Sequence, residues 1–195
     1  MIVKPVTLVG DFVRLEPMAL THLDGLCEVG LEASLWALTP TQVETRTDMF
    51  GYVEAALGDA ARGAALPFVT IEKASGKVVG STRFFEIGTA NLRCEIGWTW
   101  IAPAWQRTAI NTESKLLMLT HAFETWGCNR VQLKTDVLNM QSRTAILRLG
   151  AKEEGIFRQH IVCADGRLRD SIYFSIIKDE WPSVKARLEE RLSVK

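Results

Sequence analysis

The sequence predicts a mixed α/β (α+β) domain built on a largely antiparallel sheet. A strand–loop–helix–strand unit occupies the middle of the chain, from Cys94 to Asp136, and strand pairs with short turns lie on both sides of it. The 195 residues are 47% hydrophobic and 24% charged, which is ordinary globular composition and enough for one domain. We expect this single domain over residues 6–181 and a C-terminal helical tail over residues 182–195.

The central strand is predicted from Cys94 to Ile101 by alternation and residue type. One face would carry Cys94, Ile96, Trp98 and Trp100, and the other Glu95, Gly97, Thr99 and Ile101. Gly97 indicates a bulge or a close backbone approach. Pro103 cannot donate to a ladder, so the strand should end before it.

The central helix is predicted from Asn111 to Trp126, because apolar side chains recur at spacings of three and four. Asn111 is a favoured N-cap residue, and Gly127 suits a left-handed C-cap. Glu113 lies in the first turn, and we expect it to point away from the preceding loop. A loop that meets a helix N-terminus after a strand is a ready anion site, because backbone N–H groups point outward there.

Before this unit, the pattern predicts two helices and four strands. The turn Gly10-Asp11 joins a strand pair within 6–16, and Thr21 resembles the cap of the first helix, with Asp24 three residues later. The other elements are a helix over 47–62 and strands over 66–72 and 78–85 around the turn 73–77.

After the unit, the pattern predicts a strand from Arg130 to Asp136 with Val131, Leu133 and Thr135 on one face. A short helix follows over 139–149 and ends at Gly150. The last hairpin comprises strands 156–163 and 168–177, and a helix covers 179–192 with Pro182 in its first turn.

Charge and composition argue against several classes of function. The 23 basic and 23 acidic residues balance, so no global field favours nucleic acid or an anionic membrane. No apolar run approaches the roughly 20 residues that span a bilayer. Cys27, Cys94, Cys128 and Cys163 show no metal-ligand spacing, so we expect buried, reduced thiols, no metal and a cytoplasmic protein.

The chain resembles the GCN5-related N-acetyltransferase (GNAT) superfamily, in its RimJ/RimL ribosomal-protein acetyltransferase branch. The motifs that carry the resemblance are short and occur in order: residues 95–98, 103–106, 111–113, 135–137, 139–142, 148–151, Gly155, 169–171 and 179–182. The resemblance covers about residues 6–181. It implies a mostly antiparallel sheet that is flanked by helices and split at the strand–loop–helix unit by a coenzyme A site.

The resemblance also implies which residues hold acetyl-CoA. Backbone N–H groups of the loop, with Gln106, would hold the pyrophosphate, the backbone at Trp100 and Ile101 would pair with the pantetheine arm, and Asn139 would bind that arm. The loop residues are Arg107, Thr108, Ala109, Ile110, Asn111 and Thr112. Ala109 and Asn111 replace the two small positions of the family pattern Gln/Arg-x-x-Gly-x-Gly/Ala, although Ala is small and Asn tolerates unusual backbone geometry. Arg143 or Lys115 could meet the 3′-phosphate or simply be solvated charges.

The implied reaction is direct attack of a primary amine on the thioester, and Glu95 is the candidate base. The alternative for Glu95 is a structural ion pair with Arg83 or Arg93. The tyrosine that many relatives place near the leaving thiolate is replaced by Ile146. Ser142 could donate to the sulfur, or it could be the N-cap of the 143–149 helix, or both.

The sequence leaves the acceptor open between a protein N-terminus and a small amine. Trp36 could border the acceptor groove, whereas the other tryptophans are expected in the core. His22, His121 and His160 are expected to be surface or cap residues, and Cys128 and Cys163 lack a partner base. A homodimer is common in the family. The alternative function is a non-catalytic CoA-binding or interaction protein of the same fold.

Overall fold

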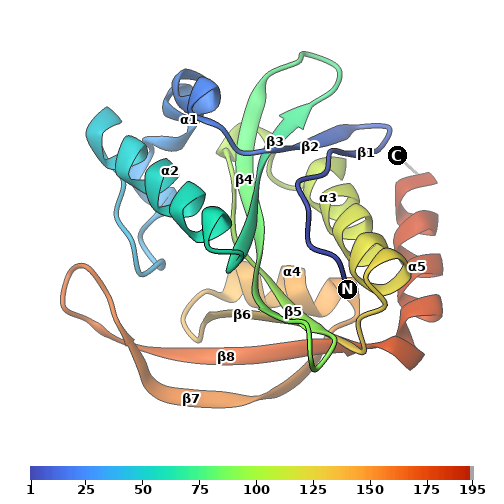
Figure 1. The fold of residues 1–195 in the computed structure, drawn as a ribbon. Helices are drawn as coiled ribbons and strands as arrows, with labels where there is room; N and C mark the ends of the chain where they lie inside the picture. The colour runs from blue at the N-terminus through green and yellow to red at the C-terminus, as the bar shows by residue number, and fades with distance from the viewer. Residues whose placement is uncertain (194–195) are drawn as a thin grey trace.

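The computed structural model describes residues 1–193 and contains one eight-stranded sheet in the order β1-β2-β3-β4-β5-β6-β8-β7 (Figure 1). Every neighbouring pair is antiparallel except β5 and β6. The strands are β1 Leu8–Val9, β2 Val13–Pro17, β3 Ala65–Glu72, β4 Val78–Gly88, β5 Arg93–Ile101, β6 Arg130–Asp136, β7 Lys152–Val162 and β8 Leu168–Ile177. The predicted fold class, a mixed fold on a mostly antiparallel sheet, is confirmed.

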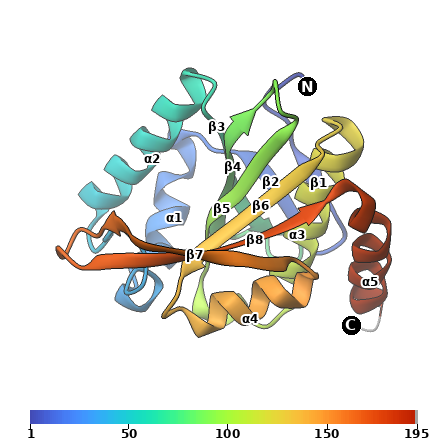
Figure 2. The ribbon, with the colours of Figure 1, turned by 90° about the horizontal axis from the view of Figure 1, so that it is seen from below.

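Helices cover both faces of the sheet and create two cores (Figures 1 and 2). On one face α1 and α2 pack over a smaller core that includes Leu26, Tyr52 and Trp100. On the other face the larger core takes side chains from α3, α4 and α5, including Met118, Ile146 and Leu188. The helices are α1 Leu23–Gly30, α2 Arg46–Ala61, α3 Ala109–Thr120, α4 Met140–Leu149 and α5 Trp181–Ser193. In this part of the chain no helix is long and apolar enough to cross a membrane.

The sheet is split between its two parallel strands. Strand β5 pairs with β6 at Arg93↔Arg130, Cys94↔Val131 and Glu95↔Gln132 and then leaves it. Beyond that point β5 stays bound to β4 as far as Ile101, and β6 stays bound to β8 as far as Asp136. The facing backbone edges of 96–101 and 133–136 are therefore left without a strand between them.

A bulge in β5 overturns part of the predicted face alternation. Trp98 has a φ of +50°, and the β4–β5 register shifts between Ser81 and Arg83. Cys94 and Ile96 lie in the larger core as expected, but Trp100 lies in the smaller core on the opposite face and Ile101 in the larger one. One extra residue reverses every later side chain, because strand side chains alternate with a period of two. The bulge indicated by Gly97 is present next to it.

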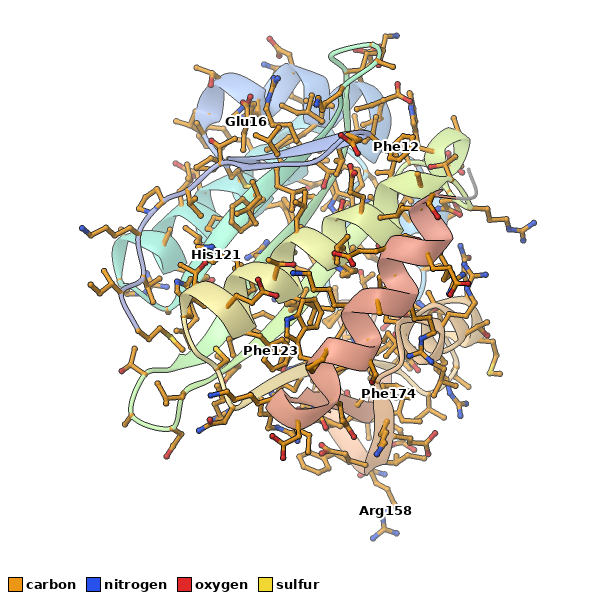
Figure 3. All side chains as sticks on the ribbon, turned by 90° about the vertical axis from the view of Figure 1, so that its right-hand side faces the viewer. Phe12, Glu16, His121, Phe123, Arg158 and Phe174 are labelled. Atoms are coloured by element: carbon orange, nitrogen blue, oxygen red, sulfur yellow. The ribbon has the colours of Figure 1, made fainter. Side chains whose placement is uncertain are left out.

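The central helix starts earlier than predicted, whereas its C-terminal end lies close to the prediction. Its N-cap is Thr108, whose hydroxyl accepts a hydrogen bond from the Ile110 N–H at 3.3 Å, so Asn111 is not the cap. At its C-terminal end α3 widens into a π-helical turn over His121–Thr125 before Gly127, which has the expected left-handed backbone with a φ of +67°. Figure 3 shows α3 beside α5, with Phe123 where the two helices approach each other.

Two other helix ends test the capping predictions. Thr21 makes no cap: it lies in a 3₁₀ turn over Leu20–His22, where the His22 Nδ1 accepts from the Ala19 N–H at 3.1 Å. Helix α4 ends at Gly150 in left-handed geometry, as predicted. The tail forms α5, whose Val184 and Leu188 lie in the larger core, and residues 194 and 195 of the predicted tail lie outside the described residues.

We expect Gly80→Ala to lower the free energy of unfolding by about 3 kcal/mol. A Cβ at Gly80 would lie 2.2 Å from the Trp100 carbonyl oxygen, so β4 and β5 would have to move apart at the bulge. Urea denaturation measures the change. Gly51→Ala is the matched control, because nothing lies within 4 Å of that position on α2 and alanine favours the helix. A loss at Gly80 no larger than that at Gly51 would contradict the close approach.

Candidate functional site

The loop between β5 and α3 forms the expected turn at a helix N-terminus. Pro103–Trp105 make a 3₁₀ turn, Arg107 adopts a left-handed φ of +62°, and Thr108 caps the helix. The first N–H groups of α3 have no acceptor inside the helix and point out of its end. Ala109 lies in the first turn and Asn111 follows within the helix, so the family's two small positions need no positive φ here.

Gln106 joins the loop to both sides of the split. Its Nε2 donates to the Ile101 carbonyl at 2.9 Å, and its Oε1 accepts from Gln141 Nε2 at 2.9 Å. Gln141 lies on α4, which follows β6. The side chain that was expected to help hold a pyrophosphate therefore also connects the end of β5 to α4.

An open cavity of about 610 Å³ lies at the N-terminal end of α3. The loop and the first turn of α3 form one wall, and the turns after β1 and β3 form the rest. The lining residues are Asp11, Phe12, Glu72, Lys73, Ala74, Arg107, Thr108, Ala109 and Ile110. In Figure 3 Phe12 lies beside this end of α3. The cavity thus combines outward-facing N–H groups, which suit an anion, with two basic side chains, Lys73 and Arg107, and two acidic ones, Asp11 and Glu72.

Glu113 is buried under the first turn of α3 and faces the turn between β1 and β2. Its Oε1 accepts from the Asp11 N–H at 2.7 Å, and its Oε2 accepts from Phe12 and Val13 at 2.8 and 2.7 Å. This carboxylate therefore accepts from three backbone N–H groups. Through these bonds it holds the β1–β2 turn, which lines the cavity, and the sequence did not suggest this role.

Glu95 occupies the last residue pair before the split. It is 1% exposed; its Oε2 accepts from Gln132 Nε2 at 2.8 Å, and its Oε1 lies 3.6 Å from Lys134 Nζ without a hydrogen bond. Burial raises the pKa of Glu95, while Lys134 and Gln132 oppose that rise. The alternative of an ion pair with Arg83 or Arg93 is not found among the described residues, where the nearby cation is Lys134, on the neighbouring strand β6.

Asn139 and Ser142 lie together at the start of α4, across the split from β5. The Asn139 Oδ1 accepts from the Ser142 N–H at 2.9 Å, so Asn139 is the N-cap and Ser142 is not. The Ser142 hydroxyl is thus released from the capping role that was its alternative. Ile146, at the usual tyrosine position, is 7% exposed and packs in the larger core.

Trp36 lies in the smaller core with only 3% of its surface exposed. Its Nε1 donates to the Gly30 carbonyl at 2.8 Å, and its ring packs against Tyr52 and Trp100. The most exposed tryptophan is instead Trp98, which is 40% exposed and so does not lie in the core as expected. The segment after α1 also meets the tip of the β7–β8 hairpin, where the Ala164 N–H donates to the Pro40 carbonyl at 3.0 Å.

Sequence reasoning missed the environment of Arg83. This side chain is 3% exposed, and its guanidinium lies over the rings of Tyr52 and Trp98, 5.0 and 4.3 Å from their centroids. The nearest carboxylate oxygen, on Asp59, is 3.9 Å away. Arg83 therefore supports Trp98 at the bulge. A charged residue inside a strand of buried residues was the only signal.

The remaining candidates are structural, with one exception. Lys115 is buried rather than solvated, and it is treated separately below. His121 is half-buried against Phe84 and Trp126, which corrects the expected surface position, and burial lowers its pKa. Cys94, Cys128 and Cys163 are buried free thiols, whereas Cys27 is half-buried. Residues 1–193 contain no group of three or more metal-ligating side chains.

Comparison with known proteins places this geometry in a family. A profile described as "Acetyltransferase (GNAT) domain" matches residues 13–152. The protein called "Putative ribosomal N-acetyltransferase YdaF" from Bacillus subtilis (strain 168) is 33% identical over 110 residues, which are 56% of this chain and 59% of YdaF. The chain thus spans less than two thirds of the length of the curated relatives that it matches.

Solved structures give the same result over more of the chain. A GCN5-related N-acetyltransferase from Brucella melitensis is 32% identical with a TM-score of 0.89, and the match covers 96% of this chain and 86% of that one. RimJ from Mycobacterium smegmatis, solved in complex with CoA-disulfide, is 23% identical with a TM-score of 0.80 over 96% and 95% of the two chains. At this identity, the comparison with RimJ shows only that the two chains share a fold.

Proposed function

The chain belongs to the acetyltransferase (GNAT) family, and from this premise we propose that it transfers an acetyl group from acetyl-CoA to a primary amine by direct attack within a ternary complex. The observation that carries the proposal is the split of β5 from β6, which begins at the buried carboxylate of Glu95 and opens toward the N-terminus of α3. A thioester held in the split would meet a base at its inner end and an anion site at its outer end.

The anion site suits the pyrophosphate of acetyl-CoA. Backbone N–H groups of Arg107 to Thr112 lie at the positive end of the α3 dipole, where that of Ile110 already donates to the Thr108 hydroxyl. Arg107 and Lys73 bring positive charge to the cavity, and Asp11 and Glu72 oppose it. Gln106 would support the loop, because its bond to Ile101 fixes where β5 ends. The substitutions Ala109 and Asn111 are compatible with this role since both have helical backbone.

The pantetheine arm is proposed to lie along the unpaired edge of β5 at Trp100 and Ile101. Trp100 and Ile101 present backbone groups there, although their side chains are buried. Asn139 would bind the arm from the other side of the split. Its Oδ1 caps α4, which leaves the Nδ2 amide as the group that could donate to a ligand.

Direct attack requires a neutral amine, so the base must offset the free energy of deprotonating it. At pH 7 deprotonation costs about 1.4 kcal/mol for an α-amino group and roughly 4.6 kcal/mol for a lysine. Glu95, whose pKa is raised by burial, is the proposed base, directly or through a water. This difference favours a protein N-terminus as the acceptor, as the resemblance suggests, with a small-molecule amine second. Trp36 is kept as a proposed acceptor-side residue that acts through the packing of Trp100. We include a cytoplasmic location and a homodimer in the proposal.

We expect acetyl-CoA to raise the melting temperature in a saturable way. At 100 times its Kd, a ligand that binds only the folded chain stabilises it by about 2.7 kcal/mol, or several degrees for a domain of this size. Dephospho-CoA and ATP are the controls. The same preparation is then offered peptides with free or blocked N-termini, and thiol release is measured. No shift with acetyl-CoA would contradict the CoA site. A shift without thiol release from any amine would favour the non-catalytic alternative.

A further inference from the structure

Lys115 on α3 is a buried lysine without an acidic partner. It is 5% exposed, and within residues 1–193 no carboxylate oxygen lies within 4.0 Å of its ammonium group. Its Nζ donates instead to two hydroxyl groups, Thr99 Oγ1 at 2.7 Å and Thr82 Oγ1 at 3.3 Å. Burial alone lowers the pKa of Lys115 to about 7. A lysine at such a place, facing the sheet from the apolar side of a helix, serves packing poorly.

Of the two hydroxyl groups, that of Thr99 connects this lysine to the split. Thr82 is buried in β4, whereas Thr99 is an exposed residue of β5. Thr99 directly follows the Trp98 bulge, beyond the last β5–β6 pair at Glu95. The two oxygens are 2.8 Å apart. Lys115 thus donates to the Thr99 hydroxyl, which itself donates to the Gly97 carbonyl at 3.4 Å, and Thr99 is exposed on the strand along which the thioester is proposed to lie.

Among the described residues, Lys115 makes no hydrogen bond or ion pair with another ionisable side chain. From β4 and β5 the groups that face Lys115 are the hydroxyls of Thr82 and Thr99. On α3 itself, Glu113 is turned to the β1–β2 turn, and His121 packs against Phe84 and Trp126. The charge of Lys115 can therefore change without a compensating ion pair.

Besides Thr99, the site offers the Ser142 hydroxyl as a proton donor for the leaving group, but among the described residues no lysine is bonded to Ser142 as Lys115 is to Thr99. Breaking the thioester leaves a thiolate, whose conjugate thiol has a pKa near 8.5 in model compounds, so protonation assists its departure near neutral pH. Ile146 is buried in the core. Tyr52 is also buried, and its hydroxyl group lies 3.1 Å from the Ser81 hydroxyl. A group beside β5 that gives up its proton near pH 7 would provide the proton that these residues do not.

We propose that Thr99 protonates the sulfur of coenzyme A as the carbon–sulfur bond breaks, and that Lys115 then returns a proton to Thr99. The inference rests on the proposed acetyl transfer and names its acid. As the amine nitrogen forms its bond to the acetyl carbon, the carbon–sulfur bond breaks and sulfur takes the electron pair. The Thr99 proton passes to sulfur, and a Lys115 proton passes to the Thr99 oxygen. The proton lost by the amine goes to Glu95, and solvent later restores Lys115. Thr99 is then the catalytic residue and Lys115 a positioning and proton-supplying residue.

The first test follows kcat against pH in the wild type, Lys115→Met and Thr99→Val, with Thr82→Val as the matched control. The wild type should lose kcat as pH rises and Lys115 loses its proton. Both test variants should show kcat lowered by roughly 100-fold near pH 7, with this alkaline decline absent and the Kd for acetyl-CoA unchanged. Thr82→Val keeps the Lys115–Thr99 contact and should keep the decline. Full kcat with an unchanged decline in either test variant overturns the inference.

The second test reports the charge of Lys115 without any turnover. A lysine whose pKa falls from 10.5 to about 7 on folding loses stability relative to methionine as pH falls through that window, because the unfolded chain binds the proton first. The urea midpoint of the wild type should therefore approach that of Lys115→Met as pH rises from 7 to 10. A constant difference overturns the proton-supplying role. A wild type that binds acetyl-CoA but releases no thiol overturns the proposed function and this inference together, whereas turnover unaffected by Lys115→Met overturns only this inference.

Discussion

Glu95→Gln is expected to lower kcat by roughly 100-fold to 1000-fold while the Kd for acetyl-CoA stays the same. The glutamine keeps the size of the side chain and can still accept from Gln132 Nε2, so the split should keep its shape. It cannot take a proton from the attacking amine. Turnover is measured by thiol release with a saturating acceptor, and binding by calorimetry.

The dependence of kcat on pH tests the base role of Glu95 more specifically. A base works when ionised, so kcat in the wild type should rise with pH through the pKa of Glu95, which burial places above the ordinary glutamate value. Glu95→Gln should lose this acidic limb. Glu154→Gln is the control, since Glu154 pairs with Arg130 on β6 and Ser175 on β8. Turnover that survives in Glu95→Gln with its acidic limb intact would remove Glu95 from the base role.

Glu113→Ala is expected to lower the free energy of unfolding by about 3–5 kcal/mol, because it leaves three N–H groups of the β1–β2 turn without their acceptor. For a domain of this size the melting temperature should fall by about 10 °C. Glu113→Gln should recover only part of the loss, since its amide hydrogens would face backbone donors. Urea denaturation and thermal melting measure both variants.

Glu54→Ala is the matched control for this effect, because Glu54 is exposed on α2 and alanine is a good helix former. It should change stability by less than about 0.5 kcal/mol. A similarly small loss in Glu113→Ala would show that water replaces the carboxylate and that the β1–β2 turn does not depend on it. The affinity for acetyl-CoA tests the same wall of the cavity, since Asp11 and Phe12 line it.

The sequence predicted the elements of the site well and their side-chain environments poorly. Periodicity placed β5, α3 and β6 within a few residues, because it depends on local burial. The face of Trp100 was wrong because a bulge at Trp98 is a response to packing between strands. The cap was wrong because Thr108 and Asn111 are both good N-cap types, and local pattern cannot choose between them.

The roles of Glu113 and Lys115 could not be read from the sequence for a different reason. The three donors that Glu113 binds are about a hundred residues away along the chain. Lys115 looks like a residue of the polar side of α3, and only the assembled sheet shows that Thr82 and Thr99 enclose it. Glu95 could be singled out as a candidate by its place in a motif, although its partner Lys134 lies on a strand that approaches only after folding.

The left-handed turn at Arg107 has a consequence for how this loop can diverge between lineages. The unusual backbone angle falls on Arg107, before the helix starts, and not on Ala109 or Asn111. The shape of the loop therefore depends on a left-handed backbone at residue 107 and on a small side chain at residue 109, whereas position 111 needs only a residue that tolerates a helix. A search that demands glycine by letter would discard sequences that keep the same backbone path, so annotation of such chains is better based on the shape of the loop.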